Sequence, residues 1–262
     1  MSPLITSLFS LEGKTAIVLG ATGGLGQAMT TALAEAGANI VSVELPSDSQ
    51  SEALRSNVEK AGRTHMVFHS NVGDAKSLRG AFAQIWEKGV VPDILLNCAG
   101  IQRRGKVEEI TDKDLDDVLN VNLKASFIAA QEFGKELLRL NRPGKIINIA
   151  SIISFIGNVD ISPYAASKGG VLQFTKAFSN EWSGKGINVN CICPGYIRTP
   201  LTQQYSSDPK YKGYNEYIIG RTPIGRWGEP QDLVGAVIYL ASRASDFVTG
   251  TSIVCDGGLL AK

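Results

Sequence analysis

The 262-residue chain is 44% hydrophobic and 19% charged, a composition typical of a globular protein with a sizeable core and not of a disordered one. Its 26 Lys and Arg residues nearly balance its 25 Asp and Glu residues, so the net charge of +1 provides no basic field for binding nucleic acid or an acidic membrane surface. No apolar run is long enough to span a bilayer, and the first thirteen residues contain no Lys or Arg, so we expect a soluble, cytoplasmic protein without a signal peptide.

Apolar strands and helices alternate along the chain. The first predicted strand, Thr15–Leu19, leads into a glycine-rich loop, Gly20–Gly26, and an alanine-rich helix that ends near Gly37. A second strand, Asn39–Val43, stops at Glu44. The further predicted elements are helix Ser51–Ala61, strand Thr64–Phe68, helix Ala75–Lys88, strand Ile94–Leu96, strand Lys145–Ile149, helix Pro163–Trp182, strand Asn188–Ile192, helix Gln231–Ala241 and strand Ser252–Cys255.

This alternation predicts an α/β fold, a doubly wound parallel sheet of the Rossmann type with helices on both faces. No linker or composition break divides the sequence, so we expect residues 1–262 to form a single domain. Residues 199–227 form one irregular stretch, rich in Tyr, Gly, Pro and charge. Because this stretch follows a strand end, it is predicted to be a substrate lid.

The glycine loop is the first candidate ligand site. A loop between a strand and a helix presents backbone N–H groups and a helix N-terminus to a phosphate, and the expected ligand is a dinucleotide. The glycines fit two spacings, Gly20-xxx-Gly24-x-Gly26 or Gly20-xx-Gly23-xx-Gly26.

Glu44 lies at the end of the second strand, 24 residues beyond Gly20. A carboxylate at this place can accept hydrogen bonds from the adenosine ribose and would repel a 2′-phosphate. No Lys or Arg stands in the glycine loop or just after Glu44, so the sequence predicts that NAD(H) is favoured over NADP(H). A solvated turn carboxylate is the alternative interpretation of Glu44.

Tyr164 and Lys168 stand four residues apart at the start of a predicted helix, which places the phenol and the ammonium on one helix face. A tyrosine with a pKa of about 10 is a poor base at neutral pH, but a fixed cation nearby favours its phenolate. Ser151 follows a strand, so its hydroxyl would emerge at the sheet edge where ligands bind and could contact a substrate oxygen. A solvated surface pair is the alternative for Tyr164 and Lys168.

Six features occur in a fixed order, namely Gly20 to Gly26, Asn97-Cys98-Ala99-Gly100, Asn122, Ser151, Tyr164-xxx-Lys168 and Pro194-Gly195. Over nearly the full chain, this set resembles the short-chain dehydrogenase/reductase family. The resemblance implies a catalytic tetrad in which Tyr164 exchanges the proton and Ser151 orients the carbonyl. It also implies that Lys168 lowers the pKa of the tyrosine and holds the nicotinamide ribose, and that Asn122 supports a proton-relaying water.

The resemblance further implies cofactor contacts on the loops that follow the strands. These residues are Gly20, Thr22, Gly24, Leu25, Gly26, Glu44, Asn71, Val72, Asn97, Ala99, Gly100, Pro194, Gly195, Ile197 and Thr199, with Tyr164 and Lys168 of the tetrad. The sequence departs from the usual family pattern at three positions, Leu19, Asn71 and Cys98. No metal site is expected, because the cysteines form no CxxC pair and the two histidines lie in a strand-like segment.

Within the family, the chain most resembles the sugar-acid dehydrogenases of the 2-dehydro-3-deoxy-D-gluconate 5-dehydrogenase and gluconate 5-dehydrogenase type. Four stretches carry this resemblance, namely Phe9 to Lys14, Gly100 to Arg104, Lys145 to Ser151 and Arg221 to Gly228. Arg103 and Arg104 follow a strand end, and a guanidinium there could bind a substrate carboxylate in bidentate fashion. The alternative is that both arginines are solvated or bind a partner subunit.

Two other functions stay open at this point. The tyrosines of the lid, Tyr205, Tyr211, Tyr214 and Tyr217, could line an aromatic pocket of a ketoreductase acting on a larger apolar or secondary-metabolite carbonyl. The fold could also bind a dinucleotide as a sensor without turnover. The apolar C-terminal segment resembles that of family members that assemble as tetramers, so a homotetramer is expected.

Overall fold

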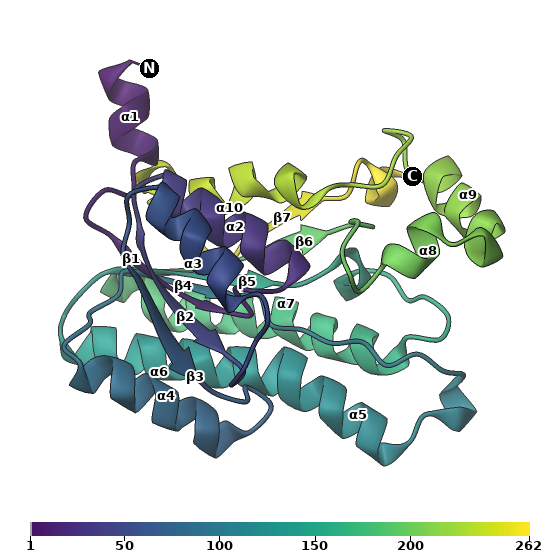
Figure 1. The fold of residues 1–262 in the computed structure, drawn as a ribbon, viewed down its shortest axis with the longest axis horizontal. Helices are drawn as coiled ribbons and strands as arrows, with labels where there is room; N and C mark the ends of the chain where they lie inside the picture. Colours follow the sequence, from purple (N-terminus) through teal and green to yellow (C-terminus); the bar gives the residue numbers. More distant parts are fainter. Residues whose placement is uncertain (1) are drawn as a thin grey trace.

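A parallel β-sheet runs through the centre of the molecule (Figure 1). In the computed structural model, which describes residues 2–262, seven strands are arranged in the order β3-β2-β1-β4-β5-β6-β7. All neighbouring strands in this sheet are parallel. The strands are β1 (Thr15–Leu19), β2 (Asn39–Glu44), β3 (His65–His69), β4 (Ile94–Asn97), β5 (Gly144–Ile149), β6 (Ile187–Pro194) and β7 (Ser252–Cys255). The predicted Rossmann-type α/β fold is confirmed.

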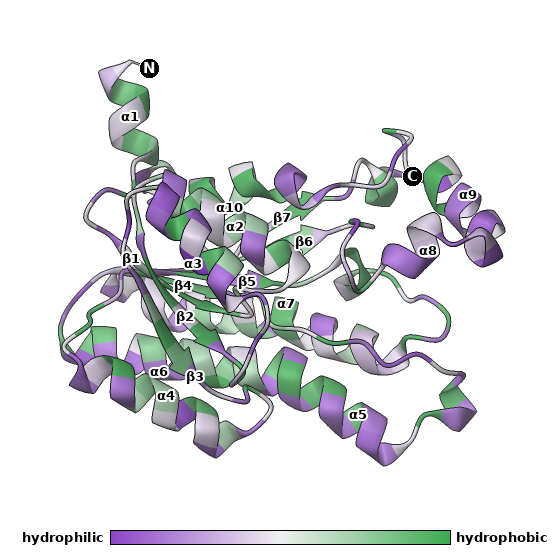
Figure 2. Ribbon diagram, in the orientation of Figure 1, coloured by the Kyte–Doolittle hydropathy of each residue, from purple (hydrophilic) through white to green (hydrophobic). Residues whose placement is uncertain are grey.

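Helices cover both faces of the sheet. One face carries α2 (Gly24–Glu35), α3 (Ser51–Lys60) and α10 (Val234–Ala241), and the other carries α4 (Ala75–Glu87), α6 (Ala125–Arg139) and α7 (Ser162–Trp182). Hydrophobic colouring is concentrated on the strands and on the inner sides of these helices, whereas their outer sides are mixed or polar (Figure 2). The strands are apolar along most of their length because both faces of the sheet are covered.

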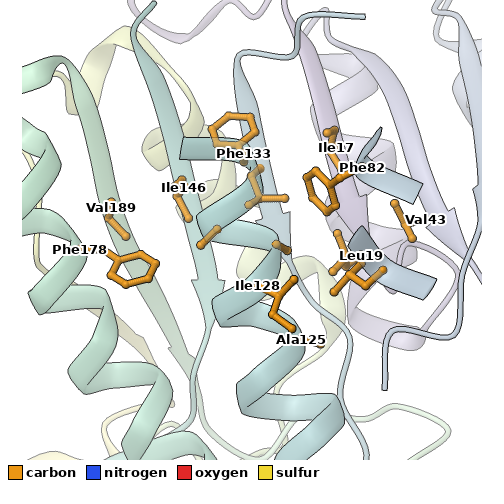
Figure 3. Packing of buried hydrophobic residues seen from close by; sticks show 14 of the residues in the cluster. Ile17, Leu19, Val43, Phe82, Ala125, Ile128, Phe133, Ile146, Phe178 and Val189 are labelled. Atoms are coloured by element: carbon orange, nitrogen blue, oxygen red, sulfur yellow. The ribbon is translucent and has the colours of Figure 1, made fainter. Parts of the chain in front are cut away.

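Two apolar cores flank the sheet. Phe82 of α4 and Phe133 of α6 are fully buried against the strand residues Ile17 and Ile146 (Figure 3). Burial of one such side chain contributes about 1.5–3 kcal/mol relative to exposure. The second core joins the opposite face of the strands to α2, α3 and α10. Packing on both sides therefore fixes the carboxyl ends of the strands, where the loops of the candidate site begin.

Several elements were not among those predicted. A helical stretch between β4 and β5 comprises α5 (Asp112–Val118), the π-helical segment η2 (Leu119–Lys124) and α6. A short helix, α1 (Pro3–Phe9), stands away from the body of the molecule (Figure 1). The stretch 199–227, expected to be irregular, contains α8 (Gln203–Ser207) and α9 (Lys212–Arg221). No helix within residues 2–262 combines the length and apolar character needed to cross a membrane.

Candidate active site

The sheet order reverses between β1 and β4, and this point is where α/β sheets of this type bind ligands. The loops that follow these two strands touch, because a Cβ atom on Gly20 would lie 2.7 Å from Cα of Ala99. Gly20 has a φ of +72°, which a residue with a side chain rarely adopts. Gly100, next to Ala99, borders one of the predicted catalytic residues, since its Cβ would lie 3.8 Å from Nζ of Lys168. The two loops thus form one crevice leading to Lys168.

The glycine loop fits a diphosphate group. Helix α2 starts at Gly24 with Gly23 as its N-cap, and in the described part of the chain no side chain caps this end. Its first backbone N–H groups therefore remain available to an anion. A Cβ atom on Gly24 would approach Cδ of Pro200 to 2.8 Å, and one on Gly26 would lie 1.9 Å from the carbonyl oxygen of Gly20. Only glycine allows this close approach of loop, helix and lid base.

The side chain of Glu44 does not face the glycine loop. The residue is 3% exposed, and its Oε1 accepts a hydrogen bond of 2.5 Å from Oγ of Ser42. Nε2 of His65 lies 2.7 Å from the same Ser42 oxygen and 3.8 Å from Glu44 Oε1. Glu44 Oε2 has no hydrogen-bond partner among residues 2–262. The carboxylate is therefore placed in the interior, on the α3 side of the sheet.

A second carboxylate, which the sequence reasoning missed, contacts the glycine loop directly. Asp48 Oδ2 accepts a hydrogen bond of 2.7 Å from Oγ1 of Thr22. Its other oxygen accepts one of 2.9 Å from the backbone N–H of Gln50. The feature of the sequence that could have indicated Asp48 is its position, four residues after Glu44 with no Lys or Arg between them.

The predicted catalytic side chains lie together at the carboxyl ends of β5 and β6. Ser151 follows β5, and its Oγ accepts a hydrogen bond of 3.1 Å from the N–H of Ile153. Tyr164 and Lys168 project from the first turns of α7, with Nζ of Lys168 5.6 Å from the centre of the tyrosine ring. Lys168 is buried, and its ammonium donates a hydrogen bond of 2.6 Å to the carbonyl oxygen of Ile149.

Burial shifts the pKa values of these groups. Removal from water raises the pKa of the Tyr164 phenol, an effect that hydrogen bonding with Ser151 opposes. Burial lowers the pKa of Lys168 to about 8. Burial thus shifts the protonation equilibrium of both groups toward the neutral form, although Lys168 still carries its charge at pH 7. Above about pH 8, Lys168 keeps its positive charge only if a negative or polar group binds next to it.

Asn122 lies in the π-helical segment η2, and such wide turns are frequent at functional sites. Its amide makes two hydrogen bonds with the backbone of Ile101, at 2.8 and 3.0 Å. Asn122 Nδ2 also donates to Oγ of Ser167 at 3.1 Å, and Ser167 in turn donates to the carbonyl oxygen of Tyr164 at 2.7 Å. Asn122 therefore ties the loop after β4 to the helix that carries Tyr164.

A cavity of about 90 Å³ opens in front of Ser151 and Tyr164. Its lining includes polar groups, Gln102, Arg104, Asn158 and Tyr196 among them, and an apolar wall of Ile152, Ile153, Ile161 and Leu201. The guanidinium of Arg104 lies 4.7 Å from the ring centre of Tyr205 and 6.0 Å from that of Tyr214. Both tyrosines belong to the stretch 199–227, so this stretch borders the cavity.

The two adjacent arginines differ in their surroundings. Arg103 faces α5, where its guanidinium lies 3.7 Å from Asp114 and 3.7 Å from Asp117. Arg104 instead lines the cavity, against the lid tyrosines. Of the pair, Arg104 has the position from which a guanidinium can contact a ligand beside Ser151.

Most of the other predicted cofactor residues stand at or near the carboxyl ends of the strands, and one exception among them is directed into the interior. Leu25 packs on the α2 core, and Asn71 and Val72 follow β3. Pro194 ends β6, where Gly195 lies against Asp256, and Ile197 is bridged to Gly228. Thr199 meets the glycine loop at Gly24. The exception, Asn97, is buried below the crevice and donates hydrogen bonds to Asn148 and Ser126.

Comparisons with known proteins agree with this arrangement. A family model described as enoyl-(acyl carrier protein) reductase matches residues 20–260. The 2-dehydro-3-deoxy-D-gluconate 5-dehydrogenase of Dickeya dadantii (strain 3937) is 41% identical over 263 residues, 99% of this chain and 100% of that protein. The enzyme of the same name from Bacillus subtilis (strain 168) is 43% identical over 255 residues, 97% of each chain. A crystal structure of a gluconate 5-dehydrogenase from Burkholderia cenocepacia J2315, in complex with NADP and tartrate, matches with a TM-score of 0.91 at 34% identity, over 98% of this chain and 99% of that one.

Proposed function

This chain belongs to the short-chain dehydrogenase/reductase family, and we propose that it is an NAD(H)-dependent oxidoreductase that interconverts a secondary alcohol and a ketone on a sugar acid. The observation that carries the proposal is that Ser151, Tyr164 and Arg104 line the same cavity. Proton-transfer groups and a cation around one small cavity match a hydroxy acid better than a neutral apolar carbonyl.

A nicotinamide dinucleotide, when bound in the crevice, would supply the hydride acceptor for oxidation and the hydride donor for reduction. The residues present fit such a group, since the uncapped N-terminus of α2 and the glycine cradle suit a diphosphate. Lys168 uses one of its three N–H donors on Ile149, which leaves two donors for ribose hydroxyls.

In the direction of oxidation, the Tyr164 phenolate accepts the proton of the substrate hydroxyl, and in reduction the phenol returns it to the carbonyl oxygen. The Ser151 hydroxyl donates a hydrogen bond to that oxygen and orients it. The charge of Lys168 favours the phenolate through its proximity to the ring. Asn122 holds the loop after β4 and the start of α7 in register, and a water beside it would carry protons to solvent.

The substrate carboxylate binds Arg104. This guanidinium lines the cavity, whereas Arg103 is directed toward the acidic residues of α5. An arginine fork pairs with a carboxylate through two charge-assisted hydrogen bonds. The relatives named for gluconate derivatives support a sugar acid as the substrate class.

NAD(H) is the preferred cofactor. Two carboxylates, Glu44 and Asp48, lie at the end of β2 or in the loop after it, and the segment between them contains no Lys or Arg to bind a 2′-phosphate. The related B. cenocepacia structure holds NADP, so this preference is a property proposed for this chain and not for the group as a whole.

We also propose that residues 1–262 act as one catalytic domain with 199–227 as the substrate lid, in a cytoplasmic homotetramer. Tyr205 and Tyr214 of this lid lie against Arg104, which supports a role for the lid in substrate binding. Sedimentation that detects only monomers at micromolar concentration would contradict the tetramer.

The test is an absorbance assay of reduced nicotinamide, with NAD(H) and NADP(H) in parallel, over sugar acids, matched polyols and bulky apolar ketones. We expect turnover of a sugar acid with NAD(H). Turnover of bulky ketones alone would identify a ketoreductase of larger apolar carbonyls instead. Cofactor binding without turnover of any compound would indicate a non-catalytic sensor.

A further inference from the structure

The two carboxylates near the end of β2 point in different directions. Glu44 turns back along its strand, because its hydrogen-bond donor, Ser42, lies two residues earlier in β2. The other member of this group, His65, comes from the first residue of β3 and pairs in the sheet with Ile40. These contacts hold the Glu44 carboxylate away from the carboxyl end of the strand, and the side chain is wholly buried.

Ser42 couples the other two side chains of this group. If its hydroxyl donates to Glu44 Oε1 at 2.5 Å, its oxygen accepts from Nε2–H of His65 at 2.7 Å. A hydrogen bond to a charged acceptor is short and strong, and this one lies in a buried site where water does not compete. These hydrogen bonds therefore stabilise the inward orientation of the Glu44 side chain.

Asp48 is placed at the glycine loop by the loop that follows β2. Ser47 adopts a φ of +65° in the turn that the N–H of Asp48 closes by donating to the carbonyl oxygen of Leu45 at 3.3 Å. The Asp48 carboxylate then receives hydrogen bonds from the Thr22 hydroxyl at 2.7 Å and from the N–H of Gln50 at 2.9 Å. Asp48 is only partly buried, so its carboxylate is in contact with both the glycine loop and solvent.

We propose that Asp48, and not Glu44, is the carboxylate that faces the 2′ position of the adenosine ribose and excludes the 2′-phosphate of NADP. The inference rests on the proposed dinucleotide-binding function and assigns one of its specificity determinants. A ribose hydroxyl can donate a hydrogen bond to the Asp48 carboxylate. A 2′-phosphate at the same place would meet a like charge, with no Lys or Arg among residues 44–50 to offset it.

The test compares three variants, Asp48→Asn, Glu44→Gln and Glu52→Gln, with the wild-type chain. Dissociation constants for NAD and NADP are measured by calorimetry without substrate, so the readout does not depend on turnover. Glu52→Gln is the matched control, because it removes one charge from the start of α3, where Glu52 is 87% exposed. Thermal unfolding checks that each variant is folded, and Asp48→Ala serves as a second variant at the assigned position.

We expect Asp48→Asn to lower the dissociation constant for NADP by about tenfold relative to that for NAD, the size expected for removing one like charge close to a phosphate. Glu44→Gln and Glu52→Gln should change this ratio less than twofold. A larger shift in Glu44→Gln than in Asp48→Asn, or no shift in either Asp48 variant, would overturn the assignment while leaving the proposed function intact. Failure of the wild-type chain to bind either dinucleotide would overturn the proposed function as well.

Discussion

The ammonium of Lys168 is hydrogen-bonded to the carbonyl oxygen of Ile149 at 2.6 Å, which fixes a buried cation at the junction of β5 and α7. The same Nζ lies 5.6 Å from the centre of the Tyr164 ring. Because the charge is buried, the position that serves catalysis is unfavourable for the stability of the ligand-free protein.

Replacement of this lysine should therefore stabilise the fold while abolishing activity. Burial lowers the pKa of Lys168 from 10.5 to about 8, so at pH 7 the folded protein carries a charge that it holds less favourably than the unfolded chain does. Lys168→Met removes the cost of burying the charge but also loses the hydrogen bond to the carbonyl oxygen of Ile149. The net effect should be an increase of about 1–2 kcal/mol in the free energy of unfolding at pH 7.

The pH dependence of this effect has a defined sign. Between about pH 8 and 10.5 the unfolded wild-type chain binds more protons at this site than the folded one, so the wild type gains stability relative to the variant as the pH rises. Urea unfolding at pH 7 and pH 10 measures the difference. A Lys168→Met variant that is less stable than the wild type at pH 7 would contradict the proposed destabilisation by the buried charge. The same holds if the difference in the free energy of unfolding between the variant and the wild type is as large at pH 10 as at pH 7.

Two glycines of the same loop should respond differently to alanine. Gly20→Ala places a side chain at a φ of +72° and a Cβ 2.7 Å from Ala99, so we expect a loss of at least about 2 kcal/mol in the free energy of unfolding. Gly23→Ala is the matched control, because its φ is −70° and the closest atom lies at 3.4 Å. It should change stability by less than about 1 kcal/mol. If denaturant titrations show equal losses in the free energy of unfolding for both variants, the close contact between the loops after β1 and β4 would be contradicted.

Arg104→Ala should raise KM for a sugar acid by about 10- to 100-fold, the size expected for loss of charge-assisted hydrogen bonds. The KM for the matched polyol, which lacks the carboxylate, should change little. Arg103→Ala serves as the control and should have a smaller effect, since Arg103 faces Asp114 and Asp117. Steady-state kinetics with both compounds gives the comparison, and an equal loss on both would discard the carboxylate contact.

The lid should influence the same step through Tyr205, whose ring centre lies 4.7 Å from the Arg104 guanidinium. Tyr205→Leu removes the aromatic face and should raise KM for the sugar acid by about two- to fivefold, the range of an exposed cation–π contact. Tyr205→Phe retains the ring and should resemble the wild type. If kinetic assays show that Tyr205→Phe is as impaired as Tyr205→Leu, the effect belongs to the hydroxyl and not to the stacking.

Local patterns in the sequence were sufficient to predict the sheet and helix α7. The apolar run at Thr15–Leu19 and the glycines after it specify a strand and a tight loop without help from distant residues. The spacing of Tyr164 and Lys168 likewise places both on one helix face before any tertiary contact is known.

Features between β4 and β5 and in the lid were harder to predict. Helix α5 has a recognisable start, since the Thr111 hydroxyl accepts from the N–H of Asp114, but the elements predicted from the sequence did not include it. In the lid, Tyr211, Tyr214 and Tyr217 recur every three residues, a helical spacing that Gly and Pro in the same stretch obscured.

The orientation of side chains at the adenosine end depends on contacts between distant segments. Glu44 stands at the strand end as the sequence predicts, but its carboxylate turns inward because Ser42 and the distant His65 bind it there. Asp48 accepts a hydrogen bond from Thr22, 26 residues earlier, after a turn in which Ser47 has a positive φ. Neither arrangement follows from the spacing of the motif.

The Tyr164→Phe variant shows whether the Tyr164 hydroxyl transfers the proton of the reaction, because the substitution removes only that oxygen. The measurement is the single-turnover rate with a sugar acid and NAD, together with the dissociation constant for NAD. We predict a rate at least about 100-fold below that of the wild type, with a dissociation constant within about threefold. A variant that binds NAD normally and reacts at the wild-type rate would contradict proton transfer by the Tyr164 hydroxyl.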